Sequence, residues 1–202
     1  MAKRRTPEMT LDGWLNLARS KVVENRIASH EGLDDFQAIV HTAARRDNLD
    51  WDEAVAILHM VYGWMPTMLR PIAPHSPEQR RRSLTALQKA RAGGLLNTTE
   101  LADVQHFANR SVVGASKLLH VISPESYVIW DSRVAEVFMW KDVTRGAYAT
   151  PYRYDEYMTH LRSWEKDPEV ADRCAQIRKL NSALNNTGNL RLIELVLFRG
   201  RK

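Results

Sequence analysis

The chain has 202 residues, of which 44% are hydrophobic and 26% are charged. This composition provides enough apolar surface for a buried core and excludes an intrinsically disordered chain. Cys174 is the single cysteine, so an intrachain disulfide and a four-cysteine metal or iron–sulfur site are excluded. The seven histidines show no H-x-x-x-H spacing, and we therefore expect no bound metal and no cofactor.

The charge and the apolar pattern bear on partners and location. A formal net charge of +5 suits a polyanionic partner, but it is equally common in ordinary enzymes. No apolar stretch reaches the roughly 20 residues that cross a bilayer. The start, MAKRRTPEMTLDGWLNLARSKV, carries charges where a signal peptide needs an apolar run. We expect a cytoplasmic monomer without a membrane partner.

The first half of the chain carries repeated helix starts, each a capping residue followed by apolar residues at helical spacing. One of the starts, Asp50 with Glu53, is a capping-box pattern. One ends at a pair of glycines, a common helix terminator. The predicted helices follow Thr10 (apolar stripe 11–22), Asp34 or Asp35 (FQAIVHTAARR), Asp50 with Glu53 (AVAILHMVYGW, ended by Pro66 and Pro71), Ser76 (from Pro77 at the first helical position to the terminator Gly93 and Gly94), and Asn97 with Glu100 (LADVQHFAN).

The second half continues in the same way, with one exception. Residues 127–130, YVIW, form a short apolar run directly before Asp131, which opens the helical pattern SRVAEVF. Residues 141–154 are expected to be a loop, and helices are predicted over 154–164, 168–184 and 190–198. Since no strand pattern competes with the helical ones, the predicted fold class is all-α.

A helical hairpin is predicted over residues 99–122. Helix TELADVQHFAN, the tight turn RSVVG and helix ASKLLHVI have the layout of a helix-hairpin-helix motif. Gly114 near the second helix would let a phosphate oxygen approach backbone N–H groups, helped by the helix N-terminus. The alternative is an ordinary corner between two helices that needs glycine for its turn.

The hairpin and the segment VIWDSRVAEV that follows it together resemble the helix-hairpin-helix superfamily of DNA glycosylases. The similarity is to the 8-oxoguanine glycosylase and endonuclease III type, without its iron–sulfur cluster. In that superfamily an apolar approach segment leads to an aspartate that opens a helix. The resemblance implies one all-α domain over 1–202, a helical bundle of two lobes around a groove. It places the hairpin at 99–122, the catalytic segment at 123–140, and the N- and C-terminal helices in the second lobe.

The resemblance implies that Asp131 is the essential carboxylate. Cleavage of an N-glycosidic bond builds positive charge on the sugar, which an ionised carboxylate stabilises while it activates the attacking nucleophile. A helix N-terminus favours the same ionised form. The alternative is that Asp131 only caps its helix, a contribution of ~1 kcal/mol to stability.

Lys117 is the second catalytic candidate. Members of the superfamily that also cleave the DNA strand use a lysine of the second hairpin helix to form a Schiff base with the sugar. Such a lysine must lose its proton, which burial favours. Counting from Gly114, Ser116 stands where the lysine of the family is expected, and Lys117 follows it. The alternative is a solvated or phosphate-contacting lysine on an exposed face.

The remaining candidates concern DNA contacts and the pocket for a base that has been flipped out of the duplex. The predicted DNA-binding residues are Val112, Val113, Gly114, Ala115, Ser116 and Arg133. The predicted pocket residues are Tyr62, Trp64, Tyr127 and Trp130, whose aromatic faces suit a flipped base. Large aromatic side chains are more often part of a core, and the arginine run 80–82 is equally typical of a solvated helix face.

The expected function is excision of a damaged or modified base from double-stranded DNA, with or without strand cleavage. The setting would be base-excision repair or defence against foreign DNA with modified bases. One alternative is a non-catalytic helix-hairpin-helix protein that only grips the DNA backbone. A second is a helical interaction protein whose basic faces serve solubility.

Overall fold

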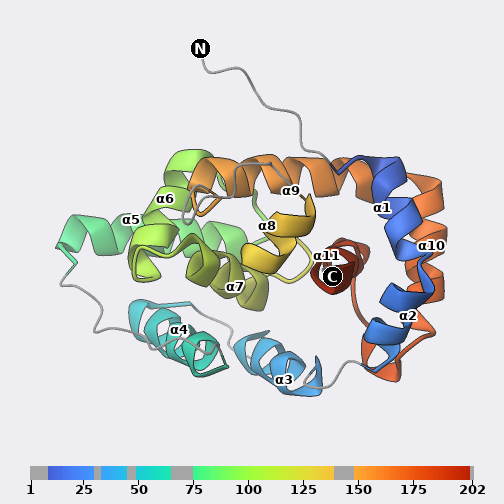
Figure 1. Cartoon of the computed structure of the whole chain (residues 1–202). Helices are drawn as coiled ribbons and strands as arrows, with labels where there is room; N and C mark the ends of the chain where they lie inside the picture. Colours follow the sequence, from blue (N-terminus) through green and yellow to red (C-terminus); the bar gives the residue numbers. More distant parts are fainter. Residues whose placement is uncertain (1–8, 30–32, 45–48, 65–74, 139–147, 201–202) are drawn as a thin grey trace, which may run out of the picture.

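The computed structural model describes residues 9–29, 33–44, 49–64, 75–138 and 148–200 (Figure 1). These residues form eleven α-helices and one 3-10 helix, and none of them is in a β-strand, which confirms the all-α prediction. The helices in chain order are α1 Leu11–Ala18, α2 Lys21–Ala28, α3 Leu33–Ala44, α4 Trp51–Trp64, α5 Pro77–Arg91, α6 Thr98–Phe107, α7 Val112–Ile122, α8 Ser132–Phe138, α9 Pro151–Glu165, α10 Pro168–Arg178, η1 Ser182–Leu184 and α11 Asn189–Gly200.

Most helix starts lie where the capping residues predict them. The side chains of Thr10, Ser76 and Asn97 each accept a hydrogen bond from the backbone N–H three residues later, and the last two complete capping boxes. Asp50 and Glu53 also bond to each other's backbone N–H groups, over 2.8 and 3.4 Å. Helix α3 begins at Leu33, ahead of the two predicted aspartates. The predicted terminators Pro66 and Pro71 lie outside the described residues.

Other helix boundaries also differ from the prediction. The stripe 11–22 is broken at Ser20, whose extended backbone caps α2, and Val22 is left 57% exposed while Val23 is buried. Helix α9 starts at Pro151 because Thr150 caps it. The predicted helix 168–184 ends at Arg178 and is followed by the separate turn η1. Residues 141–147 of the predicted loop 141–154 lie outside the described residues, and residues 151–154 belong to α9 instead of to the loop.

Two buried helices organise the packing, α7 and α11. Every residue of α7 except Val113 is buried, and α7 packs against α3, α4, α5, α6 and α9. Helix α11 packs against α1, α2, α8, α9 and α10. Figure 1 shows α9 running past both groups, with α3 and α4 beneath α7 and with α1, α2 and α10 beside α11. The described apolar side chains form one continuous core.

No helix in the described part of the chain combines the length and the apolar character needed to span a membrane.

Candidate functional site

The segment predicted to form the hairpin contains α6 and α7, which are joined by a turn of four residues. Residues 112–114 were predicted in the turn but lie in the first turn of α7. Asn109 and Arg110 in the turn between the two helices have φ of +58° and +57°. Left-handed backbone of this kind costs roughly 1–2 kcal/mol for an L-residue and is more common for asparagine. The Gln105 amide donates to the Arg110 carbonyl over 3.2 Å, and the Ser111 hydroxyl caps α7. The turn is therefore fixed by its own hydrogen bonds.

The structure corrects the role predicted for Gly114. A Cβ atom at this position would lie 2.5 Å from the hydroxyl oxygen of Tyr62, so the missing side chain makes room for α4 rather than for a phosphate. The N–H groups of Gly114 and Ala115 already donate to the side chain and the carbonyl of Ser111, over 3.0 and 2.8 Å. They have no free hydrogen for a DNA phosphate.

The side chains predicted beside Gly114 to face DNA are mostly buried. Val112, Ala115 and Ser116 are at most 3% exposed and belong to the core, while Val113 is half-buried. Arg133 is the exposed member of the predicted set, and its guanidinium lies 5.1 Å from the centroid of the Phe198 ring. Of the predicted DNA-binding side chains, Arg133 is therefore the one placed at the surface.

The apolar run 127–130 is a buried extended segment whose backbone is hydrogen-bonded by side chains instead of by a neighbouring strand. Ser116 accepts from the N–H of Trp130 over 3.0 Å and also lies 3.2 Å from its carbonyl. The ring of His120 contacts the Tyr127 carbonyl, and the Tyr154 hydroxyl donates to the Val128 carbonyl over 2.9 Å. Buried backbone groups need such partners, and the segment leads the chain rigidly to Asp131.

Two pocket predictions are corrected by this packing. Tyr127 is 2% and Trp130 is 0% exposed, so both rings are part of the core. Their polar atoms are also used internally: the Tyr127 hydroxyl donates to the Gly94 carbonyl over 2.7 Å, and the Trp130 indole donates to the Tyr148 carbonyl over 3.0 Å. Tyr62 is likewise buried, with its hydroxyl donating to the Ala108 carbonyl over 3.0 Å. Neither its ring nor its hydroxyl is presented to a ligand.

Asp131 stands at the N-terminus of α8 and is half-buried. Its Oδ1 accepts from the Val134 N–H over 3.0 Å, so the predicted cap is formed. The carboxylate also interacts electrostatically with Lys117, Arg191 and the Tyr157 hydroxyl. The aspartate is therefore neither sealed in the apolar core nor surrounded only by water.

Lys117 is buried beside Asp131, which excludes the alternative of a lysine on an exposed face. It is 8% exposed, and its Nζ lies 5.1 Å from the centroid of the Trp64 ring. Burial lowers the pKa of the ammonium, Asp131 opposes this, and Arg191 and Arg133 add to the lowering. A lowered pKa increases the fraction of neutral amine, which is the form that attacks carbon.

Trp64 is the predicted pocket residue that remains accessible. It ends the described part of α4, it is 39% exposed, and its ring packs against Phe36 of α3 with the centroids 4.5 Å apart. The Trp64 ring therefore contacts both the Lys117 ammonium and the Phe36 ring.

The sequence reasoning missed Arg191, Glu194 and Tyr157. Arg191 and Glu194 form an ion pair one helical turn apart in α11, with side chains 13% and 1% exposed. Burial lowers the pKa of Arg191 to about 10. The Tyr157 hydroxyl is buried without a hydrogen-bond partner in the described structure. For Arg191 and Glu194 the sequence held one signal, because these two charged residues interrupt the apolar pattern NLRLIELVLF.

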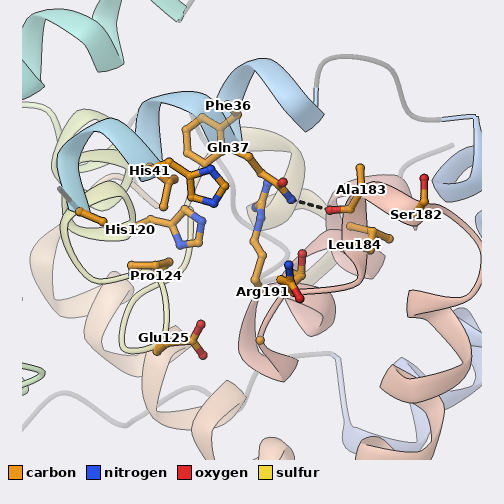
Figure 2. Close-up of a pocket in the computed structure, with 15 residues that line it drawn as sticks. Phe36, Gln37, His41, His120, Pro124, Glu125, Ser182, Ala183, Leu184 and Arg191 are labelled. Carbon is orange, nitrogen blue, oxygen red and sulfur yellow. Dashed lines mark hydrogen bonds between the residues drawn. The ribbon is translucent and has the colours of Figure 1, made fainter.

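A cavity of about 340 Å³ adjoins this group, between α3, the start of the 123–126 turn, the η1 region and α11 (Figure 2). Phe36, His120 and Arg191 form part of its wall. Phe36 and Arg191 are in contact, 5.8 Å from ring centroid to guanidinium carbon, and both also neighbour the Trp64–Lys117–Asp131 group. The cavity and the catalytic candidates are therefore adjacent parts of one region.

The arginine run 80–82 lies mainly in surface ion pairs. Arg81 pairs with Glu78 at 2.7 Å, and Arg82 pairs with Asp103 at 3.1 Å. The interpretation as a solvated helix face fits these contacts better than a patch of unpaired charge.

Comparison of the chain with protein-family models, curated proteins and solved structures found no match.

Proposed function

We propose that the chain is a DNA glycosylase that flips a damaged or modified base out of duplex DNA and cleaves its N-glycosidic bond. The observation that supports this best is the proximity of Lys117 to Asp131. The carboxylate is close enough to act on the pKa of the buried ammonium, and Arg191, which acts on both side chains, lines the adjoining cavity. The helices around α7 and those around α11 would then be the two lobes that hold the DNA.

The proposed chemistry uses Asp131 as an ionised carboxylate near the sugar. As the N-glycosidic bond breaks, its electron pair leaves with the base and positive charge develops on C1′ and the ring oxygen. A carboxylate close to this charge stabilises the transition state. Because Asp131 caps α8 through Oδ1, its orientation is fixed before substrate binds.

Lys117 is proposed as the amine nucleophile. Its neutral amine would attack C1′, and the new C–N bond would become a Schiff base after loss of a proton and opening of the sugar ring. The Schiff base makes the neighbouring sugar protons acidic, so that β-elimination of the 3′ phosphate can follow. Burial of Lys117, which lowers its pKa, supports this assignment.

The test for Asp131 is the Asp131→Asn variant, with Asp167→Asn as its matched control. Both aspartates cap a helix, with 3.0 and 2.8 Å between the carboxylate oxygen and the bonded backbone nitrogen, but Asp167 caps α10 instead of α8. Each protein is incubated with a panel of duplexes that carry single damaged or modified bases, followed by alkali to reveal abasic sites. We expect base release by the wild type and by Asp167→Asn, reduced by a factor of about 10² or more in Asp131→Asn. Equal release by both variants would contradict the assignment.

The test for Lys117 is borohydride trapping of the Schiff base on the same duplexes. Lys117→Met keeps the apolar stem, and Lys89→Met is the control because Lys89 forms a surface ion pair with Glu100 at 2.8 Å. We expect a trapped complex with the wild type and with Lys89→Met alone. Base release by the wild type without trapping would mean that water is the nucleophile and that Lys117 only positions charge.

The same experiments address the non-catalytic alternatives. A protein that only grips the DNA backbone would bind duplex DNA with strong salt dependence and would produce no abasic site. A helical interaction protein would bind no DNA at modest salt. Either result would refute the proposed enzyme.

A further inference from the structure

The cavity beside the catalytic candidates has a polar wall with a definite hydrogen-bonding pattern. Its volume of about 340 Å³ lies in the range of roughly 300–1,000 Å³ that is common for small-molecule sites. Figure 2 shows the Arg191 guanidinium reaching toward Phe36 between the His41 and His120 side and the Leu184 side. Apolar side chains, among them Val40 and Leu184, complete the wall.

His120 contributes a hydrogen-bond acceptor. Its Nδ1 lies 2.6 Å from the Tyr127 carbonyl oxygen, and since a carbonyl can only accept, Nδ1 carries the hydrogen. Burial, and secondly Arg191, lower the pKa of His120 to about 3, so the ring is neutral near pH 7. In this neutral form Nε2 has a lone pair and no hydrogen. The structure gives Nε2 no hydrogen-bond partner among the described residues.

Arg191 contributes hydrogen-bond donors to the cavity wall. The guanidinium forms an ion pair with Glu194 and has further N–H groups to donate. Glu125, which is exposed, adds a carboxylate to the same wall. The Glu125 carboxylate would repel a phosphate or carboxylate ligand, whereas it would not repel a neutral polar ligand.

We propose that this cavity recognises the lactam edge of a nucleobase, in which a ring carbonyl stands beside a ring N–H, as in uracil, hypoxanthine and guanine. Arg191 donates to the carbonyl oxygen, and Nε2 of His120 accepts from the ring N–H. An amidine edge, as in adenine and cytosine, would place an amino group against Arg191 and an unprotonated ring nitrogen against Nε2. Both pairings are repulsive, so the cavity discriminates between the two classes of base.

The position of the cavity fits delivery of such a base from DNA, and this step rests on the proposed glycosylase function. Phe36 of the cavity wall contacts Trp64, which stands over Lys117. Arg191 acts electrostatically on Lys117 and Asp131. A base held by Arg191 and His120 would therefore carry its sugar toward the two catalytic candidates.

The first arm of the test measures binding of free bases by ¹⁵N-edited NMR titration. Each base is methylated at the ring nitrogen that carries the sugar in DNA, so that no other lactam edge is created there. Uracil and hypoxanthine in this form are the lactam probes, and cytosine and adenine are the amidine probes. His120→Asn places an amide N–H where Nδ1 stands, which keeps the bond to Tyr127 and removes the Nε2 acceptor. His59→Asn, at an exposed site on α4, is the control. Ala44→Trp fills the cavity from an exposed wall position that is not part of the buried core.

We expect both lactam bases to bind at least about tenfold more tightly than the amidine bases, because a mismatched buried donor or acceptor is strongly unfavourable. His120→Asn should weaken lactam binding by about tenfold. Ala44→Trp should abolish it, and His59→Asn should change nothing. Equal or tighter binding of cytosine and adenine would overturn the proposal, as would unchanged lactam binding by His120→Asn.

The second arm measures base release from duplexes that contain one deoxyuridine or one deoxyinosine, compared with duplexes that carry modified adenine or cytosine. Release of lactam bases alone supports both proposals. Release of amidine bases alone leaves the glycosylase standing and overturns the lactam assignment. Binding of free lactam bases that depends on His120, without release from any duplex, supports the cavity assignment and refutes the proposed enzyme.

Discussion

Replacing Gly114 by alanine tests the tight contact between α7 and α4. The added Cβ would lie 2.5 Å from the Tyr62 hydroxyl oxygen and 3.1 Å from its Cζ. Tyr62 is 5% exposed and its hydroxyl donates to the Ala108 carbonyl, so the ring cannot move away without breaking that bond. The substitution therefore forces the two helices apart or displaces a buried hydroxyl.

The expected effect can be estimated from three contributions. Overpacking of a core costs about 1–3 kcal/mol, and loss of the Tyr62 hydrogen bond costs about 0.5–1.5 kcal/mol. Alanine in place of glycine within a helix gains up to about 1 kcal/mol. We expect a net loss of about 1–3 kcal/mol in the free energy of unfolding. Gly63→Ala is the control, because a Cβ there meets no atom within 4 Å, and it should stabilise by up to about 1 kcal/mol.

Urea denaturation of a double-mutant cycle measures the contact directly. Tyr62→Phe removes the oxygen that a Cβ at residue 114 would meet, so the double variant Gly114→Ala/Tyr62→Phe should lose less stability than the two single variants together. We expect a coupling free energy of about 1 kcal/mol. Additive losses, or a Gly114→Ala protein as stable as Gly63→Ala, would refute the role assigned to Gly114.

Three further predictions concern single residues. His120 has a folded-state pKa of about 3 against roughly 6.5 in the unfolded chain, so acid protonates the unfolded chain first. The free energy of unfolding should therefore fall from about pH 6.5 toward pH 3, by up to about 1.4 kcal/mol per pH unit from this group. Urea denaturation at several pH values should show a shallower fall for His120→Asn than for the wild type. Parallel plots of unfolding free energy against pH for the two proteins would contradict this. Cys174 is 0% exposed and burial raises the pKa of its thiol to about 12, so a thiol reagent should modify it only after unfolding; rapid reaction of the native protein would count against its burial. Asn97→Ala removes the capping box of α6 and should lower the free energy of unfolding by about 0.5–2 kcal/mol, measured by urea denaturation, whereas an unchanged midpoint would show that the cap is dispensable.

The sequence by itself predicted the helical fold and most helix starts, because capping is a local interaction. Ser76 and Asn97 bond to N–H groups three residues away, and these bonds depend on little beyond the local backbone. The break at Ser20 was not predictable in this way. Which apolar residues of that stripe are buried depends on packing of α2 against α11, about 170 residues further along the chain.

The candidate site, too, was predictable from the sequence only where its residues lie close together along the chain. Lys117 and Asp131 were found because they lie on adjacent elements of one recognisable segment, and the catalytic roles assigned to them stay predictions. Tyr127 and Trp130 were placed in a pocket because aromatic composition does not distinguish a core side chain from a ligand contact.

Tertiary structure alone brought Trp64, Phe36 and Arg191 to the same region. They come from α4, α3 and α11, and no local pattern relates their positions. It also decided that Lys117 is buried and that Gly114 faces Tyr62. Burial and close approach arise from contacts between segments far apart in sequence, whereas helix formation and capping depend on neighbours within one or two turns.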